Sequence, residues 1–116
     1  MHELSIAQGL LEIIEQEARP YPGARVTRVL VRLGKLSAVV PDALRFAFEA
    51  ITQGGIAEGA VLEIEEVPLT IRCHQCDEVF TIDDPFMLCP QCEGTDVEML
   101  SGRELEIRSM EIDNGD

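Results

Sequence analysis

Residues 73–92 read CHQCDEVFTIDDPFMLCPQC and hold all four cysteines of the chain. The cysteines form two Cys-x-x-Cys pairs, Cys73 with Cys76 and Cys89 with Cys92, and twelve residues separate the pairs. A two-residue spacing lets a tight turn direct both sulfur atoms at one ion, and two such turns supply the tetrahedral thiolate set that zinc prefers. This stretch therefore predicts a zinc-ribbon module in which these four cysteines bind one Zn(II) ion.

The predicted zinc site is structural, because four thiolates fill the coordination sphere and leave no open position for water or substrate. Disulfides are disfavoured, because the opening Met1-His2-Glu3 carries no secretory signal and so indicates a reducing cytoplasm. A redox dithiol would normally follow a strand in a larger α/β fold, whereas an iron–sulfur cluster stays open as an alternative. His74 either faces solvent beside the first pair or exchanges with a cysteine as a ligand.

The chain is strongly acidic, with 22 Asp and Glu against 9 Lys and Arg in 116 residues and a net charge of −13. Residues 73–102 contain seven acidic residues and no Lys or Arg, and four thiolates around one divalent ion add a charge of about −2. Such a surface repels phosphate groups, which argues against nucleic acids and acidic membranes as partners. No run reaches the roughly 18 apolar residues of a membrane-spanning helix. A protein partner is the remaining expectation.

Outside the cysteine stretch, the hydrophobic pattern predicts two helices and three strands. Apolar residues recur at helical spacing over residues 4–18 and again over residues 41–51. Apolar and polar residues alternate over residues 24–33, 61–67 and 103–112, as they do in strands with one buried face.

These elements predict an α+β fold, a small three-stranded sheet covered by two helices, with the zinc ribbon inserted between the last two strands. Residues 1–68 and 103–116 would form the α/β domain, and residues 69–102 the four-cysteine zinc-ribbon domain. Leu105 and Ile107 are expected to face the core. The apolar phase of the last strand then slips, which predicts a β-bulge near Ser109.

The first residues of the chain offer a second metal site. A large second residue generally blocks removal of the initiator methionine, so the mature chain is expected to begin Met1-His2. The Met1 amine, the His2 amide nitrogen and the His2 imidazole then form adjoining chelate rings, and a further backbone nitrogen or the Glu3 carboxylate completes the set. A planar, nitrogen-rich set favours Ni(II) or Cu(II) over zinc. The accessible terminus suits transient loading and release.

Several of these segments together resemble one protein family. The opening Met1-His2-Glu3-Leu4-Ser5, the strand end Val31-Arg32-Leu33-Gly34, the helical segment Phe46-Ala47-Phe48-Glu49 and the paired Cys-x-x-Cys turns are similar to the HypA/HybF family over essentially the whole chain. Members of that family are nickel-incorporation accessory proteins for the maturation of nickel–iron hydrogenase.

The resemblance implies an α/β domain that binds nickel through Met1, His2 and Glu3, and a separate zinc domain held by the four cysteines. It implies a cytoplasmic nickel metallochaperone that is not an enzyme. Such a protein works with a HypB-like GTPase and delivers Ni(II) to the hydrogenase large-subunit precursor. Some relatives add a carboxylate from the loop before the second helix. Here Val39-Val40-Pro41 occupies that place, and Asp42 is expected to serve the helix N-terminus instead.

Some relatives also carry a histidine beside each cysteine pair, but only His74 is present here, so a pH-sensitive zinc switch is not carried over. A zinc-stabilised protein-interaction module without a specific nickel site is the alternative function. It would keep every property of the cysteine site and lose nothing if His2 were changed. A monomer or a weak homodimer is expected, because the edge strands of a three-stranded sheet are free to pair.

Overall fold

The computed structural model describes residues 2–83 and 86–113, and the chain divides into two compact units. The first, which we call the helical unit, comprises Met1–Val31, Val39–Glu65 and Glu106–Asp116. The second, which we call the cysteine unit, comprises Arg32–Ala38 and Glu66–Leu105. Within the described residues, no helix is long and apolar enough to span a membrane.

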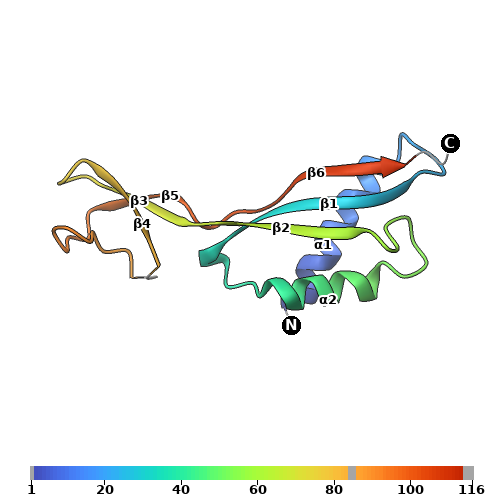
Figure 1. Ribbon diagram of the computed structural model, residues 1–116, viewed down its shortest axis with the longest axis horizontal. Helices are drawn as coiled ribbons and strands as arrows, with labels where there is room; N and C mark the ends of the chain where they lie inside the picture. Colours follow the sequence, from blue (N-terminus) through green and yellow to red (C-terminus); the bar gives the residue numbers. More distant parts are fainter. Residues whose placement is uncertain (1, 84–85, 114–116) are drawn as a thin grey trace. The chain divides into compact units, whose positions relative to one another are not determined.

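The helical unit is built on one sheet with two helices on one of its faces (Figure 1). Helix α1 spans His2–Ala18, helix α2 spans Pro41–Ile51, and the two helices contact each other. The sheet has the order β2-β1-β6, and these strands span Val61–Val67, Arg25–Gly34 and Leu105–Asp113, respectively. The predicted α+β class is confirmed. Helix α1 begins two residues earlier than the predicted residue 4, and so includes His2.

The core of the helical unit comes from the predicted apolar stripes. Its buried side chains include Ala7, Leu10, Ile14 and Ala18 of α1, Leu44, Ala47 and Phe48 of α2, and Val26, Val29 and Val31 of β1. Burial of each larger aliphatic or aromatic side chain contributes roughly 1.5–3 kcal/mol. The expectation that Leu105 faces this core is wrong, because Leu105 begins an edge strand and is 41% exposed.

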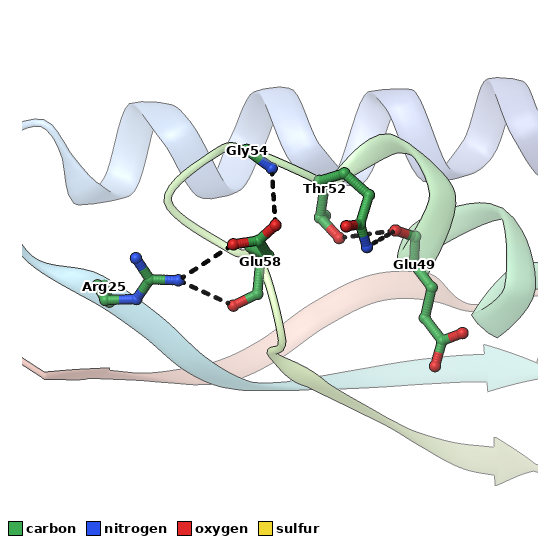
Figure 2. A network of polar contacts seen from close by, with 6 residues as sticks. Arg25, Glu49, Thr52, Gly54 and Glu58 are labelled. Carbon is green, nitrogen blue, oxygen red and sulfur yellow. Dashed lines mark hydrogen bonds and ion pairs between the residues drawn. The ribbon is translucent and has the colours of Figure 1, made fainter.

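A polar network fixes the loop that leads from α2 to β2 (Figure 2). The buried hydroxyl of Thr52 donates to the Phe48 carbonyl at 2.8 Å and ends the helix. Six residues later, Glu58 accepts the Gly54 N–H at 3.1 Å, and its backbone carbonyl accepts from the Arg25 guanidinium at 3.2 Å. The loop therefore satisfies its own backbone groups and returns the chain to the sheet.

The cysteine unit has a sheet of its own, with the order β4-β3-β5. Strand β3 spans Leu69–Cys73, β4 spans Glu78–Ile82 and β5 spans Val97–Ser101. Both outer strands pair antiparallel with β3, and the β3–β5 register shifts between Thr70 and Ile71. A short 3₁₀ helix, Lys35–Ser37, also belongs to this unit.

Two glycines lie against each other where the chain enters and leaves the cysteine unit. Gly34 ends β1, and a Cβ atom there would overlap the backbone of Gly102 and the nitrogen of Arg103. A Cβ atom on Gly102, whose φ is +131°, would lie 2.9 Å from the Leu69 Cδ1 atom. Two hydrogen bonds close this glycine crossing. The Gly34 N–H donates to the Glu104 carbonyl and the Leu36 N–H to the Gly102 carbonyl, both at 2.7 Å.

We predict that Gly34→Ala destabilises the protein by about 3 kcal/mol or more, because the new methyl group meets backbone that cannot rotate away. The matched control is Gly9→Ala, since Gly9 lies inside α1 with no atom within 4 Å of the added methyl. That change should stabilise the helix by about 1 kcal/mol. Urea unfolding followed by circular dichroism measures both. Equal stabilities for the two variants would contradict the close approach.

Candidate metal centres

The four cysteines converge in the cysteine unit. Their sulfur atoms all lie within 4.8 Å of one another. The Cys73 and Cys92 sulfurs are 3.8 Å apart, and the Cys76 and Cys89 sulfurs are 3.9 Å apart. Each close pair joins one cysteine from each Cys-x-x-Cys turn, so the two turns face each other across a common centre.

The sulfur cluster has the size that a zinc ion requires. With Zn–S bonds of about 2.3 Å, the edge of a regular tetrahedron is about 3.8 Å. The two measured separations, 3.8 and 3.9 Å, match that edge. All four cysteines are free of disulfides, and two of them, Cys73 and Cys89, are buried. These residues could hold one ion in a tetrahedral set of four thiolates. Such an ion would cross-link the two Cys-x-x-Cys turns and would have no open position for catalysis.

The two Cys-x-x-Cys turns have the same backbone path. In the first, the Asp77 N–H donates to the Cys73 carbonyl at 2.8 Å, and in the second the Glu93 N–H donates to the Cys89 carbonyl at 2.9 Å. Both Asp77 and Glu93 adopt left-handed backbone angles, with φ of 57° and 60°. The N–H of the second cysteine in each turn also points at the sulfur of the first, at 3.4 and 3.5 Å.

The thiols interact strongly because they are so close. Burial raises the pKa of Cys76, and contacts with the other three thiols raise it further, to about 12. Burial also acts to raise the pKa of Cys89, but the backbone N–H groups of Cys92 and Gln91 outweigh it and lower the pKa to about 7. Four negative sulfurs within 4.8 Å repel one another, so full ionisation of the cluster requires a cation at its centre.

The N-terminal candidate residues lie on the first turn of α1. The His2 side chain is 57% exposed, and its Nε2 atom lies 3.5 Å from the Glu3 Oε2 atom. The Glu3 side chain is only 16% exposed, and Oε2 also accepts the backbone N–H of Val40 at 3.3 Å. His2 is thus accessible to a metal, whereas Glu3 is engaged at the start of α2. The predicted ligand Met1 lies outside the described residues.

The pKa of the Glu3 carboxyl is lowered. The largest cause is the hydrogen bond from its own backbone N–H, followed by the N–H of Val40 and the charge of the neighbouring His2. The sequence analysis named Val40 only as part of the loop before the second helix, and not as a contact of Glu3. Val40 directly precedes Pro41, and proline is a favoured first residue of a helix. The N–H groups at the start of a helix need acceptors from outside the helix. The sequence therefore indicated that this segment needs an acceptor, but not that Glu3 supplies it.

Two other candidate residues have other contacts. Asp42 lies in the first turn of α2, is 95% exposed and accepts a 3.0 Å hydrogen bond from Arg45. Its role at a helix N-terminus matches the expectation. His74 is 49% exposed in the cysteine unit, and its Nε2 atom lies 3.7 Å from Glu98. The described metal-ligand cluster contains the four cysteines and not His74.

An α+β unit and a separate unit with four converging thiols define the class of a small protein with a cysteine cluster that could hold a metal ion. The family model for "Hydrogenase/urease nickel incorporation, metallochaperone, hypA" matches residues 1–112. The hydrogenase maturation factor HypA of Roseiflexus sp. is 47% identical over 115 residues, which cover 98% of this chain and 94% of the relative. That of Nostoc punctiforme is 44% identical over 113 residues, which cover 97% and 96%.

Solved structures agree with the family match. A solution structure of a HypA protein matches with a TM-score of 0.72 and 26% identity, covering 98% of each chain. The solution structure of the Ni metallochaperone HypA from Helicobacter pylori matches with a TM-score of 0.66 and 25% identity, covering 94% of this chain and 95% of that one. The chain belongs to the HypA family of nickel metallochaperones and hydrogenase maturation factors.

We predict that Glu3→Gln removes a pH-dependent part of the stability. A carboxyl whose pKa is lowered in the folded state stabilises the fold above the ordinary glutamate pKa, about 4.3, and this contribution is lost as the pH falls through the lowered value. The wild type should therefore be the more stable at pH 7, and the difference should shrink towards pH 3. Thermal unfolding at both pH values measures it. A constant difference would contradict the charged contact between Glu3 and Val40.

Proposed function

We propose that this protein carries Ni(II) at its N-terminus and transfers it during maturation of a nickel–iron hydrogenase. The observation that carries the proposal is the position of His2, whose exposed imidazole lies on the first turn of α1, next to the chain terminus. The family match over residues 1–112 supports nickel as the cargo. The Met1 amine, the backbone nitrogens near His2 and the His2 imidazole would bind the ion.

The contact between Glu3 and Val40 supports a more specific proposal for Glu3 in this site. Its Oε2 atom accepts the Val40 N–H at 3.3 Å and lies 3.5 Å from the His2 Nε2 atom. A carboxylate in that place ties the first turn of α1 to the start of α2 and limits the movement of the ligand-bearing turn. We therefore propose that Glu3 completes the nickel site through its carboxylate or its backbone nitrogen, with the same side chain holding His2 in place.

The cysteine unit would bind one Zn(II) through Cys73, Cys76, Cys89 and Cys92. The match between the sulfur separations and a zinc tetrahedron supports this ion. Its role would be structural, so that residues 69–102 form the zinc domain, and residues 1–68 and 103–116 the nickel-binding domain. With a saturated zinc ion and nickel as cargo, the protein would have no enzymatic activity of its own.

Transfer of nickel requires partners that approach an acidic protein with a net charge of −13. We propose a HypB-like GTPase and the hydrogenase large-subunit precursor as these partners, and the cytoplasm as the location. The names of the curated relatives, hydrogenase maturation factors, support this assignment. The protein would act as a monomer or a weak homodimer and would bind neither nucleic acid nor membranes.

Nickel titration by calorimetry at about pH 7.5 tests the N-terminal site. The zinc-loaded wild type should bind one Ni(II), and His2→Ala should weaken binding at least tenfold, or by about 1.4 kcal/mol. One extra glycine before Met1 should weaken it similarly, because it displaces the amine from the chelate. Since protons compete for the ligands, affinity should also fall as the pH is lowered.

The control variant for this titration is His74→Ala, because His74 is the only other histidine and belongs to the cysteine unit. It should bind nickel like the wild type. Equal binding by the wild type, His2→Ala and the glycine-extended form would overturn the N-terminal site. The protein would then be a zinc-stabilised interaction module without a specific nickel site.

Removal of zinc with a chelator should unfold the cysteine unit and leave the helical unit folded. The cysteine unit buries few large apolar residues, among them Val67, Leu69 and Ile71, whereas the helical unit has a core of its own. Hydrogen exchange should become fast in β3, β4 and β5 and stay slow in α1 and α2. Cys73→Ser should reproduce this result and His74→Ala should not. Protection of β3–β5 without zinc would contradict a structural role for the ion.

A further inference from the structure

The four cysteines differ strongly in how far solvent reaches them. Cys73 and Cys89, the first cysteine of each turn, are 0% and 1% exposed. Cys76 is half-buried, and Cys92 is exposed. The two turns share one backbone path, so this difference does not come from the turns themselves. It comes from the residues that cover each cysteine, and Cys92 is the most exposed of the four.

The two buried sulfurs also accept backbone hydrogen bonds. The Cys89 sulfur accepts two backbone N–H groups, from Gln91 at 3.4 Å and from Cys92 at 3.5 Å. The Cys73 sulfur accepts the Cys76 N–H at 3.4 Å. A buried thiolate that accepts backbone hydrogen bonds is shielded and held in place, so its bond to a metal is hard to replace.

Cys92 has a different environment, formed by Gln75 and Gly94. The Gln75 Oε1 atom lies 3.8 Å from the Cys92 sulfur, and the backbone N–H of Gly94 donates to that sulfur. A Cβ atom on Gly94 would lie 3.2 Å from the Cys92 sulfur and 3.3 Å from Gln75 Oε1. Because glycine has no Cβ atom, only the backbone of Gly94 lies on that side of the sulfur.

We infer that Cys92 is the exchangeable ligand of the four-cysteine site, where a soft electrophile meets the bound thiolate. This inference rests on the proposed zinc site. In the reaction, the Cys92 sulfur donates an electron pair to the incoming carbon, and the leaving group departs with the electrons of its own bond. The resulting thioether would be neutral and would bind zinc weakly, so that Cys73, Cys76 and Cys89 would be left to hold the ion. Gln75 and Gly94 set how easily the electrophile approaches.

Limited alkylation of the zinc-loaded protein with iodoacetamide tests this inference. Zinc content is measured first, and one zinc per chain shows that the proposed site stands. Peptide mapping by mass spectrometry then gives the order of labelling. Cys92 should be labelled at least tenfold faster than Cys73 and Cys89, and faster than Cys76. Singly labelled molecules should appear before any that carry four labels.

Two variants test the path to Cys92. Gly94→Ala should slow labelling of Cys92 several-fold, because the added methyl lies against the sulfur. Gln75→Ala should speed it, because it removes the neighbouring side chain. Gly9→Ala and Gln91→Ala are the matched controls and should leave the rate unchanged. Each variant is compared at one zinc per chain, so that a change in rate is not a loss of the ion.

The outcomes separate the inference from the proposal beneath it. A protein that binds no zinc would overturn the proposed zinc site and the inference together. One zinc per chain with Cys76 or Cys73 labelled first would overturn the inference alone. So would molecules that acquire all four labels at once, because they would react only after the unit unfolds. If Cys92 is labelled at the wild-type rate in both the Gly94→Ala and the Gln75→Ala variants, the roles assigned to Gly94 and Gln75 are overturned.

Discussion

The close approach of Gly34 and Gly102 is the constraint on which the path of the chain into and out of the cysteine unit depends. A side chain at either position would collide with backbone or with Leu69. The crossing brings the segment that enters the cysteine unit beside the segment that leaves it, and the hydrogen bonds from Gly34 to Glu104 and from Leu36 to Gly102 hold them together. One continuous chain can therefore fold a second sheet without separating β1 from β6, which share the first sheet.

Each unit solves the problem of stability in a different way. The helical unit buries aliphatic side chains from α1, α2 and β1, and needs no ion to complete its core. The cysteine unit buries few large side chains, and four sulfur atoms lie close together inside it. Small units with little hydrophobic core are commonly stabilised by a metal ion or by disulfides. In the proposed function this division separates a permanent ion from a transported one, because the transported ion would bind at an exposed chain end.

The helices and strands with a long hydrophobic pattern could be predicted from the sequence. The short strands beside the cysteines could not. Helical spacing located α1 and α2, and alternation located β1, β2 and β6. The strands β3, β4 and β5 have five residues each, too short for a clear period beside the cysteines, although Leu69, Ile71 and Cys73 do alternate with exposed or half-buried neighbours. The contact between Glu3 and Val40 joins residues 37 positions apart, which no local pattern reveals.

The positive φ angles of Asp77 and Glu93 have a consequence for metal affinity. A left-handed backbone costs about 1–2 kcal/mol for most residues, less for Asp, whose short side chain tolerates it, and nothing for glycine. The second turn, which ends in Glu93 at φ 60°, is therefore the more strained of the two. Part of the free energy of binding the proposed zinc ion would be used to hold that turn in its left-handed conformation. In the proposed zinc site, the chain would bind its ion less tightly than the four ligands alone would allow, and a glycine at position 93 would recover the difference.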